Sequence, residues 1–150
     1  YIQLEQLRFN NKFDYHLSID QKIDVENSEI PPLLIQPYIE NAILHGLINK
    51  NGKGDLWLSL ERNNGLIVCK IEDNGIGRAK AWEIEQGKVS RHKSLGIKVT
   101  EERISGLFAL LDYKMEVVTE DLFEIKQGSG ETPEPAGTRV TISIPVKEEE

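Results

Sequence analysis

The first residues that could do chemistry are polar side chains inside a segment that is otherwise apolar on every side. They are Gln36, Glu40, Asn41 and His45. Asn41 and His45 are four residues apart, so a helix places them on one face, with Glu40 beside that face. Burial without a partner would cost roughly 2–7 kcal/mol for each polar group. A carboxylate and an amide oxygen on a pocket wall suit a hard cation such as Mg²⁺. The alternative is a helix edge in water, with Glu40 hydrated.

A second group of candidate residues follows a predicted strand. Asp73, Gly75 and Gly77 lie in the run Asp-Asn-Gly-Ile-Gly. An acid at the end of a strand can accept a hydrogen bond from the amino group of a base, and glycines let the backbone approach a ligand closely. The same run would also make an ordinary turn.

A third group lies at the predicted start of a helix. Ser94, Leu95 and Gly96 begin this helix, and Lys93 precedes them. Free N–H groups and the helix dipole at such a position favour phosphate. The alternative is that Ser94 is an ordinary N-cap.

The elements that must position these residues follow from apolar periodicity. A strand at 13–19 carries His16 on its polar, solvated face, and a helix runs from 31 to about 48, buried on both sides. Pro37 is expected to remove one bond from that helix. Strands at 55–62 and 66–72 are joined by an Asn-Gly hairpin. The remaining predicted elements are a short helix at 78–86, a helix at 95–111, strands at 114–119 and 140–144, and a flexible hairpin tip at 127–137.

This order of elements predicts an α+β domain. We expect a two-layer α/β sandwich, with a mixed, largely antiparallel sheet of about five strands and about three helices on one face. The 150 residues suffice for one core. A net charge of −7 argues against a nucleic-acid partner. Cys69 is the only cysteine, which excludes an internal disulfide and favours a reducing cytoplasm.

Taken together, the motifs resemble the histidine kinase branch of the GHKL ATPases, most closely sensor kinases of the LytS type. The stretch from Pro32 to Gly46 resembles the N-box of that family nearly position for position. Residues 73–77 resemble the G1 box, residues 94–97 a reduced G2 box, and residues 137–145 the closing Gly-Thr strand. The resemblance covers essentially the whole chain and implies the Bergerat fold, with ATP and Mg²⁺ as ligands.

The resemblance also implies a role for each matching residue. Asn41 would ligate Mg²⁺ between the phosphates. Glu40 would orient a Mg²⁺-bound water or assist proton removal from the attacking histidine, which makes Glu40 and Asn41 the expected catalytic pair. His45 would lie near the phosphates or the ribose.

For the nucleobase, the resemblance implies that Asp73 binds the adenine amino group. Gly75 and Gly77 would allow its close approach, and Thr138 would support it.

For the phosphates, the resemblance implies a mobile lid at 78–93. Lys93, Ser94, Leu95 and Gly96 would hold phosphate oxygens. Leu44 stands where many histidine kinases carry a lysine, so Lys93 or Arg91 would supply that charge from the lid.

The expected organisation is the end of a connector helix at 1–10, an ATP-binding catalytic domain at 11–147 and a frayed end at 148–150. The implied partners are upstream phosphoacceptor and dimerisation helices, forming a homodimer in the full-length protein, and a response regulator. No histidine of this chain has the setting of a phosphoacceptor, so we expect the chain alone not to phosphorylate itself. The implied location is the cytoplasmic side of an inner-membrane-anchored sensor, with any membrane contact made by upstream segments.

Two alternatives remain open. A serine kinase of the anti-sigma-factor type would have the same fold, but the helical spacing at Tyr1–Phe9 looks like a connector from an upstream domain and disfavours it. A degenerate pocket used as an interaction module is disfavoured by the presence of all five motif residues, Glu40, Asn41, Asp73, Gly75 and Gly77.

Overall fold

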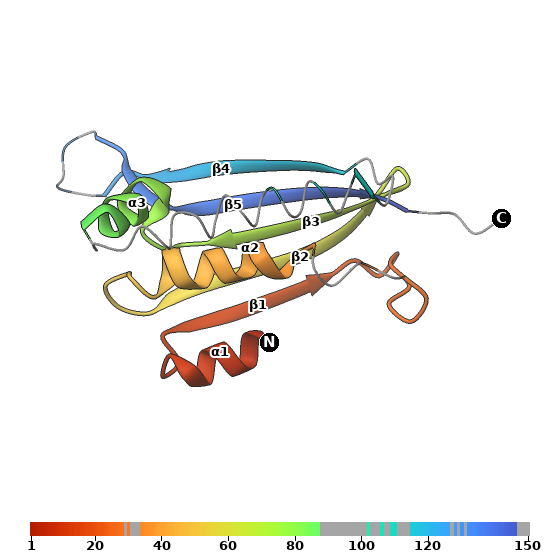
Figure 1. Cartoon of the computed structure of the whole chain (residues 1–150), viewed down its shortest axis with the longest axis horizontal. Coiled ribbons are helices and arrows are strands. Elements are labelled where there is room, and N and C mark those ends of the chain that lie inside the picture. Colours follow the sequence, from red (N-terminus) through yellow and green to blue (C-terminus); the bar gives the residue numbers. More distant parts are fainter. Residues whose placement is uncertain are drawn as a thin grey trace.

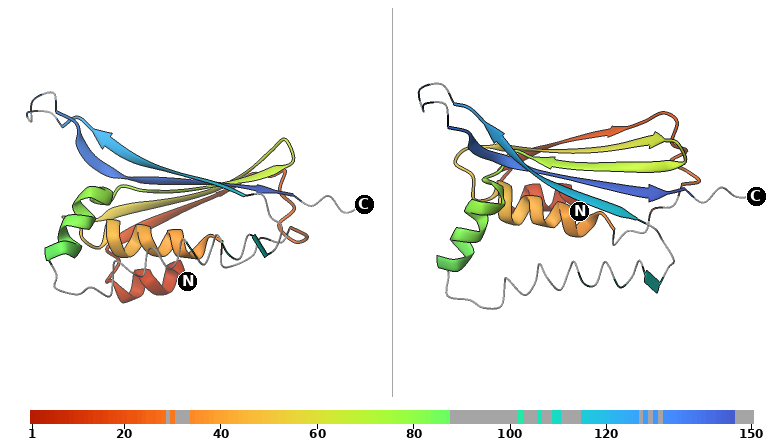
Figure 2. Two further views of the ribbon diagram at one scale, coloured as in Figure 1. Left: turned by 45° about the horizontal axis from the view of Figure 1, so that its top comes forward. Right: turned by 90° about the horizontal axis from the view of Figure 1, so that it is seen from above.

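A computed structural model describes most of the chain. The described residues are 1–28, 30, 34–87, 102, 106, 109–110, 115–126, 128, 130 and 132–146. They form one sheet with the helices on one of its faces, as the views in Figures 1 and 2 show. The predicted two-layer α+β architecture is confirmed.

The sheet has five strands in the order β1-β2-β3-β5-β4. Their bounds are β1 Phe13–Ile19, β2 Gly54–Asn63, β3 Leu66–Asp73, β4 Glu116–Glu124 and β5 Glu134–Pro145. β1 runs parallel to β2, and the other neighbouring pairs are antiparallel. Because β1 and β2 are parallel, the chain must return over one face of the sheet from the end of β1 to the start of β2. This crossover connection contains the helix that bears Asn41 and His45.

The hairpin between β2 and β3 confirms its sequence signal. Asn64 and Gly65 have φ values of 46° and 75°, the left-handed values that a tight two-residue turn requires. The connection between β4 and β5 ends earlier than the predicted tip at 127–137, because β5 already begins at Glu134. Before Thr138, β5 pairs only with β4, so Pro135 leaves no bond unmade on the β3 side.

The helical segments whose bounds the structure describes lie on the inner face of the sheet. They are α1 (Ile2–Arg8), α2 (Gln36–Asn41) continuing as the π-helix η1 (Ala42–Leu47), and α3 (Gly77–Gly87). The predicted start at 31 is too early, because the segment at 34–35 forms a turn and α2 begins at Gln36. Pro37 consequently lies in the first turn, where its missing N–H takes no bond from the helix, contrary to our expectation.

The core lies between this layer and the sheet. Its fully buried side chains come from the helix and from the inner faces of the strands: Phe13, Ile43, Leu47, Leu56, Cys69, Ile71 and Ile142. The helix was expected to be buried on both sides, and this was wrong, because Leu44 is 40% exposed. On the edge strand β1, Leu17 and Ile19 are also 54% and 37% exposed.

The described residues in the predicted helix at 95–111 are helical, but most of that segment lies outside the described part, as does the predicted frayed end. Among the described residues, no helix is long and apolar enough to cross a membrane.

Candidate functional site

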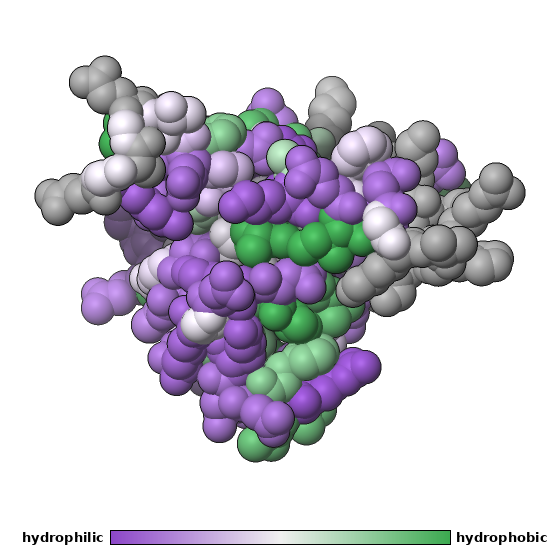
Figure 3. Space-filling view, turned by 90° about the vertical axis from the view of Figure 1, so that its left-hand side faces the viewer, coloured by the Kyte–Doolittle hydropathy of each residue, from purple (hydrophilic) through white to green (hydrophobic). Residues whose placement is uncertain are grey.

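A cavity of about 620 Å³ opens between the sheet, η1 and α3. Figure 3 views the end of the molecule where α3 and the β4–β5 hairpin lie, and its surface is mainly hydrophilic with a few hydrophobic groups between. The cavity wall comes from five regions of the chain, which are the helix α2–η1, α3 and the strands β3, β4 and β5. Its lining includes Tyr38, Asn41, His45, Ile71, Asp73, Gly77, Arg78, Trp82, Glu85, Thr119, Asp121, Thr138 and Val140.

The floor of the cavity is a row across three neighbouring strands. Asp73 on β3 pairs in register with Thr138 on β5, and Thr138 pairs with Asp121 on β4. All three line the cavity. Strand register therefore brings Asp73 and Thr138 together, and Asp121 joins them from a part of the chain with no recognisable motif.

Asp73 is the polar centre of this floor. Only 3% of its surface is exposed, and its Oδ1 accepts a hydrogen bond of 2.8 Å from the Gly75 N–H. Burial, with a smaller contribution from Glu72, raises the pKa of Asp73 to about 6. A carboxylate so enclosed is a strong acceptor for a ligand N–H, because water competes poorly for it.

Three glycines allow the backbone to close around Asp73. A Cβ on Gly46 would lie 2.7 Å from Asp73 Oδ1, and one on Gly75 would lie 2.3 Å from the Gly46 carbonyl carbon. A Cβ on Gly137, whose φ is +124°, would lie 1.8 Å from the Asp73 carbonyl oxygen. Gly75 thus packs against η1 and is not part of the described lining, whereas Gly77 lines the cavity at the start of α3.

The helical wall brings Asn41 and His45 to the cavity together, as their spacing predicted. His45 Nδ1 lies 2.9 Å from Glu85 Oε1 on α3. The contact is close but not aligned as a hydrogen bond, so Glu85 Oε1 is buried without a hydrogen-bond partner among the described groups. This oxygen can accept a hydrogen bond from a ligand or a water molecule.

Glu40 is not among the described residues that line the cavity. Its Oε1 accepts a hydrogen bond of 3.0 Å from Gln36 Nε2 on the previous turn. Successive residues of a helix point about 100° apart, so Asn41 and Glu40 leave the helix on different sides. The structure does not bring the expected catalytic pair together at one wall.

Sequence reasoning missed a bidentate ion pair at the cavity mouth. Arg78 Nε and Nη2 donate to the two carboxylate oxygens of Asp121 at 2.7 and 2.9 Å, which joins α3 to β4. Arg78 directly follows the glycine run and could have been suspected; Asp121 could be found only through strand register. The predicted phosphate-binding residues Lys93, Ser94, Leu95 and Gly96 lie outside the described residues.

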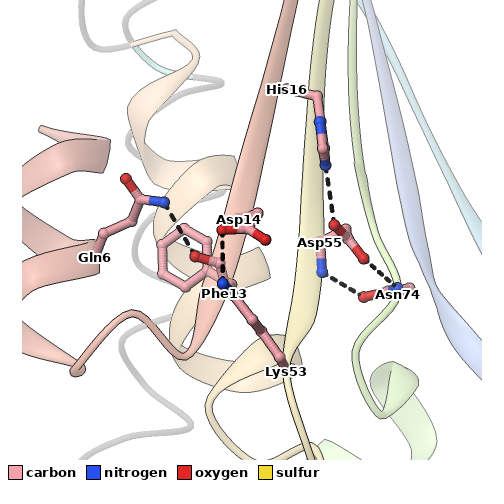
Figure 4. A network of polar contacts seen from close by, with 7 residues as sticks. All are labelled: Gln6, Phe13, Asp14, His16, Lys53, Asp55 and Asn74. Carbon is pink, nitrogen blue, oxygen red and sulfur yellow. Dashed lines mark hydrogen bonds and ion pairs between the residues drawn. The ribbon is translucent and has the colours of Figure 1, made fainter.

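A polar network reaches this site from the outer face of the sheet (Figure 4). His16 Nε2 lies 2.9 Å from Asp55 Oδ1, and Asp55 is bonded in turn to Asn74, the residue after Asp73. The hydrogen bond from His16, followed by that from Asn74, holds the pKa of Asp55 below its usual range despite partial burial. His16 is exposed, as predicted, but it has a partner.

Comparison with solved structures defines the class of fold. Over 99% of this chain and 91% of the other, the fold matches a mycobacterial sensor histidine kinase, MprB, with a TM-score of 0.56 and 12% identity. The catalytic domain of histidine kinase ThkA matches over 96% and 90% of the two chains, with a TM-score of 0.51 and 13% identity. The fold is that of the histidine kinase catalytic domain.

Sequence relatives narrow the assignment. The chain is 29% identical over 151 aligned residues to sensor protein LytS of Bacillus cereus, covering 98% of this chain and 23% of that protein. It is 30% identical over 118 residues to the sensor histidine kinase/phosphatase LytS of Staphylococcus aureus, covering 72% and 19%. A putative uncharacterized protein of Bacillus subtilis, YwpD, is 35% identical over 107 residues, covering 69% and 37%.

No protein-family profile matches the chain. The chain spans well under half the length of these curated relatives. Nearly its whole length is nevertheless homologous to LytS and other sensor histidine kinases, which confirms the resemblance seen in the N-box.

Proposed function

We propose that this chain is the ATP-binding catalytic domain of a sensor histidine kinase. The observation that carries the proposal is the buried Asp73 carboxylate on the floor of a cavity whose opposite wall presents Asn41 and His45. The Asp73 carboxylate suits the amino group of a nucleobase as a hydrogen-bond acceptor. The amide oxygen of Asn41, on the facing wall, suits a metal ion bound to a phosphate chain.

In this proposal Asp73 accepts a hydrogen bond from the adenine amino group, with Thr138 beside it. Asn41 ligates Mg²⁺, and His45 lies near the phosphates or the ribose. Among the described residues, no cluster of His, Cys, Asp and Glu is arranged to hold a metal ion alone. We therefore expect Asn41 to share the ion with phosphate oxygens and water, as Mg²⁺ prefers.

The charges of the cavity lining support a need for the metal. Four lining side chains are acids, Asp73, Glu83, Glu85 and Asp121, against one described arginine, Arg78. Such a lining repels a bare triphosphate. Mg²⁺ neutralises part of the phosphate charge when it is bound.

The reaction that we propose is transfer of the γ-phosphoryl group to a histidine nitrogen on a helical domain outside this chain. Glu40 does not line the cavity, so we assign its proposed role to the incoming histidine and not to the nucleotide. By the resemblance, residues 78–93 form the lid, and Lys93, Ser94, Leu95 and Gly96 hold phosphate oxygens.

We further propose that the full-length protein is a homodimer that passes its phosphoryl group to a response regulator. The domain would lie on the cytoplasmic side of a membrane-anchored sensor. Relatives that are named sensor histidine kinases disfavour the serine kinase alternative.

Calorimetric titration of the chain with ATP, with and without Mg²⁺, tests the proposal. We expect wild type to bind ATP more tightly with Mg²⁺, Asn41→Ala to lose that gain, and Asp73→Asn to bind weakly under both conditions. Lys53→Ala serves as the control, because Lys53 pairs with Asp14 on the exposed edge of the sheet at 2.9 Å. A wild-type chain that bound no ATP would instead support the degenerate interaction module.

A further inference from the structure

We propose that Asn74 is a positioning residue for Asp73, held by Asp55, which His16 holds in turn. The inference rests on the proposed role of Asp73 in binding adenine. It assigns a function to the one polar residue of the Asp-Asn-Gly run that is not among the described residues of the cavity lining.

Three hydrogen bonds fasten Asn74 to the start of β2. The Asp55 N–H donates to Asn74 Oδ1 at 2.7 Å, Asn74 Nδ2 donates to Asp55 Oδ2 at 3.2 Å, and the Asn74 N–H donates to the Asp55 carbonyl at 3.3 Å. A backbone N–H can only donate, so the amide oxygen must face it and the amide nitrogen must face the carboxylate. The orientation of the Asn74 side chain is thereby fixed.

Asp55 is held from its other side by β1. His16 Nε2 approaches Asp55 Oδ1 at 2.9 Å, which leaves Oδ2 for Asn74. The imidazole also stacks on Trp57, with ring centroids 5.6 Å apart. Figure 4 shows the resulting path from β1 through β2 to the segment that follows β3.

The position of the Asp73 carboxylate depends on this anchor. Asn74 stands between Asp73 and Gly75, and the Gly75 N–H is the donor that orients Asp73 Oδ1. A shift at residue 74 therefore moves both the carboxylate and its donor. Hydrogen bonds weaken steeply when their geometry deteriorates, so a small shift is enough to impair an adenine contact.

Backbone conformation does not explain the asparagine. Among the described residues, the non-glycine positions with positive φ are Asn10, Asn11 and Asn64. Asn74 is not one of them, so the tolerance of asparagine for left-handed backbone is not used there. Its side-chain bonds to Asp55 remain as the physical reason for its presence.

The arrangement of donors and acceptors suggests an exchange experiment. Asn74→Asp sets a second carboxylate against Asp55. Asp55→Asn keeps both contacts only if its amide oxygen turns to Asn74 Nδ2 and its nitrogen turns to His16 Nε2, which must then accept a hydrogen bond. In the double variant, the amide nitrogen at position 55 can donate to the carboxylate at position 74, while its oxygen still accepts from His16. The pair is restored with donor and acceptor exchanged.

Titration calorimetry of Mg²⁺–ATP and Mg²⁺–GTP against these variants measures the effect. Guanine carries an oxygen where adenine carries its amino group, so the ratio of the two affinities reports the Asp73 contact. We expect Asn74→Asp to lose about tenfold in ATP affinity, which is about 1.4 kcal/mol, and to approach equal affinity for both nucleotides. Asp55→Asn should lose less, because its amide can turn to keep its bond to Asn74. The double variant should recover most of the ATP preference, and Lys53→Ala should match wild type.

Asn74→Ser, which removes the amide without adding charge, gives a milder single variant if Asn74→Asp does not fold, and circular dichroism identifies the folded variants. The inference is overturned if the double variant is no better than Asn74→Asp, or if a folded Asn74→Asp or Asn74→Ser variant keeps the wild-type ratio of affinities. A wild type that binds no ATP, or an Asp73→Asn variant that binds like wild type, marks failure of the proposed function, and the inference falls with it.

Discussion

At the scale of single residues, Asp73 serves two demands that oppose each other. The ligand contact requires an ionised carboxylate, while burial favours the protonated form and raises its pKa from an ordinary 3.8 to about 6. The folded chain therefore binds this proton more tightly than the unfolded chain does. The contribution of this proton to the free energy of unfolding is therefore fully present below about pH 3.8 and is lost as the pH rises through about 6.

Asp73→Asn should expose this conflict. Removing the buried charge should raise the free energy of unfolding by roughly 2–3 kcal/mol at pH 7.5, because a difference of one in pKa corresponds to about 1.36 kcal/mol. The gain should shrink as the pH falls from 6 toward 4, because wild type is then protonated as well. Urea unfolding at several pH values measures the gain. A gain independent of pH would contradict burial of the charge as its cause.

How far the site could be predicted depends on where its signals lie. Asn41, His45 and Asp73 belong to motifs of local spacing, and the structure brings all three to one cavity. Asp121 is brought there only by register between β5 and β4, which no local pattern encodes. Glu40 shows that a local motif can also mislead. It is adjacent to Asn41 in the sequence, but it leaves the helix on a different side and does not line the cavity.

At the scale of elements, three glycines allow β3, β5 and η1 to pack more closely than any side chain at those positions would permit. Gly46 leaves room for the Asp73 carboxylate, Gly75 for the backbone of Gly46, and Gly137 for the backbone of Asp73. The cavity floor is therefore a junction of three elements as well as a surface of one sheet.

Gly137→Ala should break this junction. Its Cβ would meet the Asp73 carbonyl oxygen at 1.8 Å, whereas a Cβ on Gly65 would meet nothing within 4 Å. Gly65→Ala, at φ +75°, controls for the loss of a glycine at positive φ, which costs about 1 kcal/mol. The φ of +124° at Gly137 lies outside the left-handed region that alanine adopts, so backbone strain and the contact with Asp73 both add to the loss there. Thermal unfolding should show Gly137→Ala to be less stable than Gly65→Ala by about 2 kcal/mol or more. Equal losses would show that the junction relaxes freely.

Element type was predicted better than element ends. Apolar alternation identified β2 and β3 and the hairpin between them, because their turn chemistry is local. The start of β5 was missed because Pro135 and Gly137 read as loop residues, yet β5 is partnered there by a single strand that tolerates both. The late start of α2 could not be seen either, since prolines suit the first turn wherever it falls.

At the scale of the whole molecule, the two layers give the sheet two unlike faces. The inner face, with the helices, carries the cavity, and Trp82 lies at its mouth with 62% of its surface exposed. The outer face carries Trp57, which is 38% exposed beside His16. These are the only two tryptophans of the chain.

Nucleotide binding should therefore change the fluorescence of one tryptophan and leave the other unaffected. With Mg²⁺–ATP, Trp57→Phe should keep the full emission change of wild type, and Trp82→Phe should lose most of it. Each variant is the control for the other. A signal that survives in Trp82→Phe and disappears in Trp57→Phe would mean that the nucleotide binds at the outer face.

The single cysteine lies at the centre of the same sheet. Cys69 on β3 is fully buried between β2 and β5, and burial raises the pKa of its thiol to about 12. The thiolate is the form that attacks thiol reagents, so Cys69 in the native chain should not react with them until the sheet opens. A cysteine introduced at the surface can then carry a spectroscopic label without removal of the native one. The rate at which Cys69 itself is labelled would report how often the core opens.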